Sequence, residues 1–227
     1  MGSEMCIRDR VCVEFKHNYE KIFEHIYPAK NSSGFTERNL SVNFAEAYEK
    51  TAMQLNQNCI TWYEFQFGEK NNQHYDAVVV NITTKEILVI EAKRFNDLPK
   101  KIYSTVNDIR RINNFPAEIL NENSCRITDF NLYKIYGVFL ADIWTAGTSS
   151  PKLKKLIKAQ YLSQNFINTN NRIQKFINEH WSDEEKFDLN NLNIVYNVQG
   201  FDDCLALDHP IICNHYYLLS MTWEISI

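Results

Sequence analysis

The first part of the chain shows helical spacing of its apolar residues. Aromatic residues recur at intervals of four between Val11 and Tyr27, which predicts a helix that ends at Pro28. A second helix is predicted from an N-cap at Thr36 to about Leu55, because its apolar residues form one stripe at 3.6-residue spacing. The residues of that stripe are Leu40, Phe44, Ala47, Thr51 and Leu55.

Three strands are predicted after the second helix. Residues 60–67 alternate in polarity and are rich in aromatics, and residues 75–81 contain an aliphatic run. The third segment, Ile87–Lys93, is apolar on both faces, so we expect a central strand that is covered on both sides. Because the connection 82–86 is short and polar, the second and third strands are expected to pair antiparallel.

The remaining elements complete an α/β pattern. They are a helix from Leu98 to about Asn114 capped by Asp97, a strand over Leu132–Trp144, a helix from Pro151 to about His180, and strands near Leu192–Val198 and Tyr216–Ile225. This order predicts a mixed β-sheet flanked by α-helices. We interpret residues 1–10 as a disordered or non-native leader and 11–227 as one domain, with a core at about 35–144 and an extension over 145–227.

Composition narrows the class of protein. The chain has 227 residues, of which 44% are hydrophobic and 23% charged, as expected for one globular domain. Its net charge of -4 argues against a generally basic nucleic-acid binder. No apolar run approaches the roughly 20 residues that a membrane span needs. The six cysteines are scattered, and the N-terminus lacks a secretory pattern, so a cytoplasmic protein with reduced thiols is expected.

The chemistry concentrates around the third predicted strand. Asp76 begins one strand, and Glu91, Ala92 and Lys93 end the next. Alternate residues of a strand share a face, so Glu91 and Lys93 point the same way, and the antiparallel pairing returns Glu91 to the vicinity of Asp76. Two carboxylates are the ligands that Mg²⁺ takes together with water and phosphate oxygens, and the Ala92 carbonyl could add another. Lys93 could orient a water and neutralise charge in the transition state.

These residues, on a hairpin after a Glu-bearing helix, resemble the PD-(D/E)XK nuclease superfamily. The resemblance covers roughly residues 35–140, and His74-Tyr75-Asp76 stands where the family pattern has Pro-Asp. It implies a restriction-endonuclease-like fold and a phosphodiester hydrolase that uses Mg²⁺, with Mn²⁺ as a substitute. Asp76, Glu91 and the Ala92 carbonyl would hold the metal, Lys93 would assist the water, and a helical Glu37 would complete the metal shell. The implied partner is nucleic acid, in particular DNA, with a homodimer as a further expectation.

Several further residues have two readings each. His74, Arg94, Lys100 and Lys101 are candidate nucleic-acid contacts, whereas ordinary surface positions explain them equally simply. Glu37 could instead form a salt bridge with Arg38 or Arg111, and Glu64 could face the site or lie exposed on its strand. We expect the aromatics Trp62, Tyr63, Phe65 and Phe67 to pack in the core rather than stack on bases.

Other classes of function fit the sequence less well. No glycine-rich phosphate loop is present, so we expect no nucleotide cofactor. Cys204, Cys213 and His215 lack the paired spacing of a zinc site. The alternatives to a nuclease are a catalytically inactive module of the same fold that binds nucleic acid or protein, and a structural subunit in which Glu-Ala-Lys occurs by chance.

Overall fold

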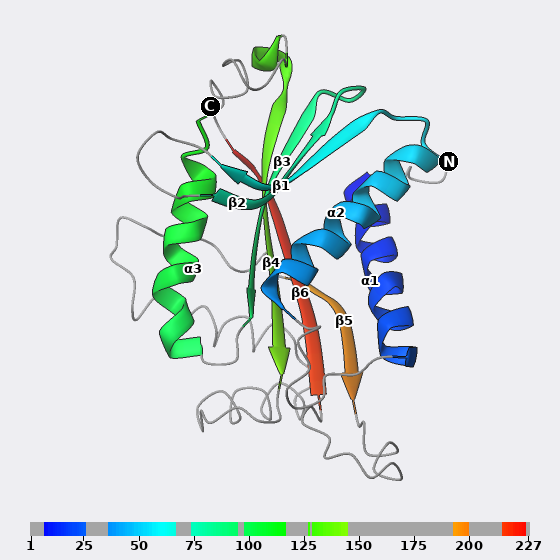
Figure 1. Ribbon diagram of the computed structural model, residues 1–227, viewed down its shortest axis with the longest axis vertical. Coiled ribbons are helices and arrows are strands. Elements are labelled where there is room, and N and C mark those ends of the chain that lie inside the picture. Colours follow the sequence, from blue (N-terminus) through cyan, green and yellow to red (C-terminus); the bar gives the residue numbers. More distant parts are fainter. Residues whose placement is uncertain are drawn as a thin grey trace.

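The computed structural model describes residues 7–25, 36–66, 74–94, 98–116, 127, 129–144, 193–199 and 215–225 (Figure 1). The statements below concern this part of the chain. The predicted helix from Pro151, the Asp97 cap and four of the six cysteines lie outside it. The two cysteines inside it, Cys12 and Cys59, are free thiols. None of the described helices is long and apolar enough to cross a membrane.

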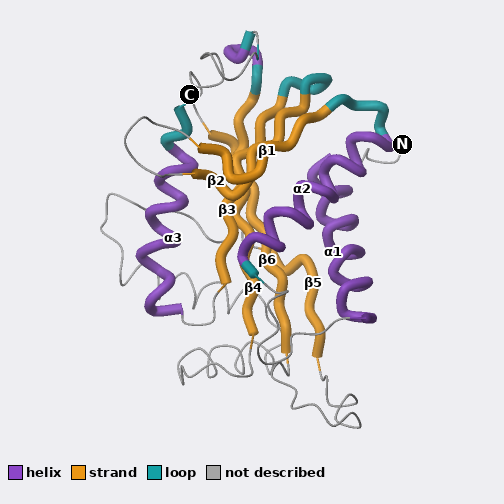
Figure 2. Tube along the Cα trace, in the orientation of Figure 1, coloured by secondary structure: helices purple, strands orange, loops and turns teal. Residues whose placement is uncertain are grey.

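A six-stranded mixed sheet forms the centre of the molecule, with the strand order β1-β2-β3-β4-β6-β5 (Figures 1 and 2). The strands are β1 (Cys59–Gln66), β2 (His74–Asn81), β3 (Glu86–Arg94), β4 (Lys134–Trp144), β5 (Asn193–Gln199) and β6 (His215–Ile225). β3 and β4 run parallel, and the other neighbouring strands run antiparallel. The predicted mixed α/β sheet and its antiparallel β2–β3 hairpin are therefore confirmed.

Helices cover both faces of this sheet. α1 (Ile7–His25) and α2 (Glu37–Gln54) lie on one face, and α3 (Leu98–Asn113) lies on the other (Figure 1). Thr36 precedes α2 in an extended conformation, as predicted, but its side chain makes no capping hydrogen bond. The late strands are integral to the sheet, since β6 pairs with β4 along its length.

Two predicted boundaries were wrong. Helix α1 begins at Ile7, inside the range that we assigned to a leader, because Ile7 lies one turn before Val11 and packs against the same core. The strand predicted from Leu132 begins at Lys134, because Phe130–Leu132 form a short 3₁₀ helix.

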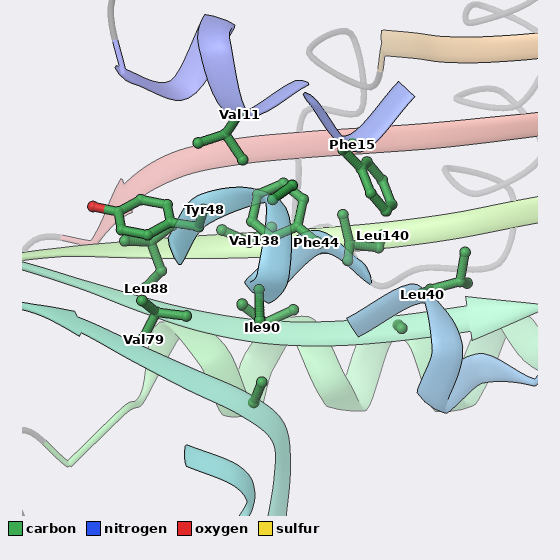
Figure 3. Close-up of a cluster of buried hydrophobic side chains, with 14 of the residues drawn as sticks. Val11, Phe15, Leu40, Phe44, Tyr48, Val79, Leu88, Ile90, Val138 and Leu140 are labelled. Carbon is green, nitrogen blue, oxygen red and sulfur yellow. The ribbon is translucent and has the colours of Figure 1, made fainter. Parts of the chain in front are cut away.

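Alternate residues of β3 contribute to two separate cores. Leu88 and Ile90 pack with the cluster beneath α1 and α2, which includes Phe44 and Tyr48 (Figure 3). Ile87 and Val89 pack with the cluster beneath α3. All of these β3 side chains are at most 2% exposed, which confirms the prediction of a central strand covered on both faces. The end of this strand is therefore held rigidly between two layers of helices.

Gly137 of β4 lies against Trp223 of the neighbouring strand β6 and Ile112 of α3. A Cβ atom at this position would lie 2.4 Å from the Trp223 ring and 2.7 Å from Ile112. The Trp223 indole cannot simply turn away, because its Nε1 donates a hydrogen bond to Asn113 at 2.8 Å. We expect Gly137→Ala to lower the free energy of unfolding by about 1–3 kcal/mol, as overpacking of a core does. Urea unfolding checks this value.

The second-site variant Trp223→Leu is the matched control for this clash. The double variant Gly137→Ala/Trp223→Leu should lose less stability than the sum of the two single losses, because the smaller side chain makes room for the methyl group. Simple additivity would show that the clash with Trp223 is not the cause.

Candidate active site

The candidate site lies at the end of β3, on the face of the sheet that α3 covers. The side chains of Glu91 and Lys93 both reach residues of α3, as the two-residue repeat of a strand requires. Asp76, on the neighbouring strand β2, uses its Oδ2 to accept the Ala92 N–H at 2.7 Å. The structure thus brings Asp76 beside the Glu-Ala-Lys segment, and one backbone hydrogen bond fixes its carboxylate there.

Glu91 is a buried carboxylate with a cation beside it. The residue is 2% exposed, and its Oε1 accepts hydrogen bonds from Nε and Nη2 of Arg111, the former at 3.2 Å. Burial, followed by repulsion from the Asp76 carboxylate, raises the pKa of Glu91 to about 8, and the Arg111 charge opposes that rise. Burial also raises the pKa of Asp76, although the Ala92 hydrogen bond and the Lys93 charge act in the other direction.

Two residues of α3 belong to the site and were missed in the sequence. Nζ of Lys93 lies 2.6 Å from Oδ2 of Asp108, and Nη2 of Arg111 lies 2.9 Å from Oδ1 of the same carboxylate. The side chain of Asp108 is only 7% exposed. A sequence signal did exist, because Asp108 lies on the same helical stripe as the buried Thr105 and Ile112, where a carboxylate needs a partner.

Arg111 is held in place from several sides. Its guanidinium lies 5.6 Å from the centre of the Tyr75 ring, and its backbone carbonyl accepts the Tyr75 hydroxyl at 2.9 Å. Tyr75 and its neighbour across the sheet, Phe65, both pack on the α3 side, whereas Tyr63 and Ala77 pack on the α2 side. Glu64, between Tyr63 and Phe65, has a φ of 50°, so the side-chain alternation is interrupted at this point of the sheet. On the α3 side, the Tyr75 ring lies beside Arg111.

Glu37 approaches the strand end from the opposite helix layer. Its Oε1 accepts the Arg94 N–H at 3.1 Å, and its charge contributes to raising the pKa of Lys93. This hydrogen bond with the Arg94 backbone differs from both alternatives considered for Glu37, which were salt bridges with Arg38 and with Arg111. Among the described residues, no three His, Cys, Asp or Glu side chains are close enough to hold one metal ion. A contribution of Glu37 to a metal shell therefore stays a prediction.

The predicted nucleic-acid contacts have internal partners where their side chains are described. His74 Nε2 lies 2.8 Å from Glu64 Oε2, and Arg94 Nη2 lies 3.1 Å from Oδ2 of the buried Asp142. Lys100 and Lys101 lie at the start of α3, but their side chains lie outside the described part of the structure. The contacts of all four residues with nucleic acid stay predictions.

Glu64 and Trp62 of β1 differ in how well they were predicted. Glu64 is 41% exposed and also lies 3.7 Å from Arg38, yet its charge is close enough to raise the pKa of Asp76. Glu64 is thus exposed on its strand, as one prediction had it, and also near enough to the site to influence Asp76, as the other had it. Trp62 was expected in the core but is 62% exposed, because β1 is the edge strand, whereas Phe65 on the same strand is buried as expected.

Asp76 and Glu91 are the pair that fits a divalent cation. In the described part of the chain, the hydrogen bonds and ion pairs of these carboxylates use Asp76 Oδ2 and Glu91 Oε1 and leave the second oxygen of each without such a partner. A cation between the two carboxylates would relieve the repulsion that contributes to the raised pKa of Glu91. Mg²⁺ is commonly bound by one or two carboxylates and completes its shell with water and substrate oxygens, so this donor set suits it.

The chain was compared with known protein families, curated proteins and solved structures. No family model matches the chain, and no curated protein and no solved structure matches it either.

Proposed function

We propose that the chain is a metal-dependent nuclease of restriction-endonuclease-like fold that hydrolyses phosphodiester bonds in DNA. The observation that carries the proposal is the convergence of Asp76, Glu91 and Lys93 at the end of the central strand β3. The two carboxylates are close enough for the charge of one to raise the pKa of the other, and the charge of the Lys93 ammonium lowers the pKa of Asp76.

The fold supports the same proposal. The resemblance rests on a Glu-bearing helix, an Asp at the head of one strand and Glu-Ala-Lys at the end of the next, within a sheet between helices. α2, β2 and β3 provide these features in this order, and the sheet continues through the parallel β3–β4 pair. A strand end at which two antiparallel strands and two helix layers meet holds its side chains in fixed positions, as catalysis requires.

Each side chain then has a distinct role. Asp76 and Glu91 would hold Mg²⁺, which supplies a bound water of lowered pKa and polarises the phosphate. Lys93 would orient the attacking water and place a positive charge near the phosphate oxygens as negative charge develops on them. The backbone N–H of Ala92 holds the Asp76 carboxylate in place, because it donates to Oδ2, and it opposes the rise of the Asp76 pKa that burial causes.

Nucleic-acid binding alone explains the cluster less well. Two carboxylates beside a phosphate backbone repel it, unless a cation neutralises them. A protein that only binds DNA gains nothing from such a pair at its binding surface, whereas a metal-dependent hydrolase needs it.

The proposal predicts metal-dependent cleavage of plasmid and oligonucleotide substrates. The wild type should cut with Mg²⁺ or Mn²⁺ and not with EDTA, and Glu91→Ala should lose at least about 10²-fold in rate, since it removes a metal ligand. The matched control is Glu46→Ala, because Glu46 is an exposed carboxylate of α2. If the wild type cuts no substrate with either metal, and Glu91→Ala leaves DNA affinity unchanged, the inactive binding module replaces the nuclease.

A further inference from the structure

Helix α3 contributes a carboxylate that joins the two cations of the site. Asp108 is 5% exposed, and its two oxygens contact different partners, Nζ of Lys93 at 2.6 Å and Nη2 of Arg111 at 2.9 Å. Arg111 in turn binds Glu91. The four side chains therefore form a continuous series of contacts, Lys93–Asp108–Arg111–Glu91, which begins and ends on the same strand.

We propose that Asp108 is the positioning residue of the Lys93 ammonium. This inference rests on the proposed nuclease function, in which Lys93 acts on the water and the phosphate. Asp108 touches neither of these and acts through Lys93.

The contacts of Lys93 show why such a residue is needed. Four carboxylates, Asp76, Glu91, Glu37 and Asp108, are close enough for their charges to act on this part of the site. In the described part of the chain, the Lys93 ammonium forms its ion pair with Asp108 rather than with Asp76 or Glu91. A lysine side chain is a flexible four-carbon stem, so its ammonium can pair with any of several nearby carboxylates. Without Asp108, the ammonium would pair with Asp76 or Glu91 and take up the oxygens that a divalent cation needs.

Asp108 is well placed to act as a fixed anchor. It lies in the third turn of α3, and Arg111, three residues further along the helix, is itself held by Glu91 and by the Tyr75 hydroxyl. The Lys93 side chain is 15% exposed and that of Asp108 is 7% exposed, so the lysine is less deeply buried than the carboxylate that contacts it. A buried anchor with a partly exposed lysine is the arrangement expected of a positioned catalytic ammonium.

The first experiment is a double-variant cycle in the cleavage assay. Asp108→Asn should lower kcat about 10- to 100-fold with little change in KM, as loss of a partner of a catalytic group does. Asp108→Glu, which retains the charge, should recover part of that loss. In a Lys93→Met background, Asp108→Asn should change the rate by less than about twofold, because the group through which it acts is gone. Asn107→Ala, at the exposed neighbouring position, is the matched control.

The second experiment does not depend on activity. Lys93 in the metal-free protein is acylated with an amine-reactive ester and quantified by peptide mass spectrometry, with the exposed Lys134 as internal reference. Exchange of Asp108 for Asp76 or Glu91 as the partner of the ammonium should change the Lys93-to-Lys134 labelling ratio severalfold in Asp108→Asn. An unchanged ratio overturns the proposal.

The outcomes separate this inference from the proposed function. If the wild type cleaves but Asp108→Asn lowers the rate equally with and without Lys93, the positioning role is wrong and the nuclease stands. If the wild type cleaves nothing with any metal, the nuclease falls and the positioning role falls with it. Full activity of Asp108→Asn also contradicts the inference.

Discussion

Lys93→Met should cleave DNA about 10²- to 10⁴-fold more slowly than the wild type, which is the range that one positioned proton-transfer or charge-bearing group contributes. Methionine retains most of the stem and removes the ammonium, so the packing around β3 is disturbed little. We expect kcat to fall while KM and divalent-metal affinity change little, because Lys93 is not a metal ligand in the proposed site. Single-turnover cleavage with saturating Mg²⁺ measures the effect.

Lys134→Met is the matched control for this variant, since Lys134 is exposed at the start of β4. It should cleave at the wild-type rate. A Lys93→Met protein that is folded and cleaves within a few-fold of the wild type would remove Lys93 from the reaction and leave the two carboxylates without their expected partner.

Arg94→Ala should lower the free energy of unfolding by about 3–5 kcal/mol, which is the cost of removing one partner from a buried ion pair. The Arg94 guanidinium donates from Nε and Nη2 to the Asp142 carboxylate, whose side chain is 1% exposed. The Tyr216 hydroxyl lies at the longer distance of 3.5 Å from the same carboxylate and is a weaker donor. The variant leaves the Asp142 charge buried without its bidentate partner, and chemical denaturation measures the loss.

This prediction decides between two readings of Arg94. A guanidinium that is available for a DNA phosphate makes no large contribution to stability, whereas one that neutralises Asp142 does. Arg110→Ala is the control, because Arg110 is exposed and contacts Asn107 on its own helix, so less than about 0.5 kcal/mol is expected. A loss below about 1 kcal/mol in Arg94→Ala would favour the phosphate contact.

The sequence was informative wherever a short-range rule decides the structure. The aliphatic run of β3 predicted a central strand, the short polar connection predicted its antiparallel partner, and the two-residue repeat predicted that Glu91 and Lys93 share a face. The same antiparallel pairing predicted that Asp76 lies near the end of β3. None of these inferences required knowledge of how distant elements pack.

The residues that were missed depend on the rotation of a helix about its axis. Asp108 and Arg111 reach the site because the face of α3 that bears them is turned toward β3. The spacing of the buried Ile109 and Ile112 shows which side of the helix is apolar, but it does not fix the rotation of the helix to within one residue. From the sequence, Arg111 was therefore considered as a possible partner of Glu37 and not of Glu91. Likewise, the alternation of polar and apolar residues predicted the strand that bears Trp62, but it did not predict that this strand lies at an edge of the sheet. At that edge, the Trp62 side chain is exposed.

We propose that Asp76 and Glu91 together hold a divalent cation, and calorimetric titration of the metal-free protein with Mn²⁺ or Mg²⁺ measures this binding. We expect one site in the wild type, strongly weakened in both Asp76→Asn and Glu91→Gln and unchanged in Glu46→Gln. Because the pKa of Glu91 is about 8, a proton competes with the metal below that pH, so binding should be tighter at pH 8.5 than at pH 6. Binding that both substitutions leave unchanged, or no binding at either pH, would contradict the account.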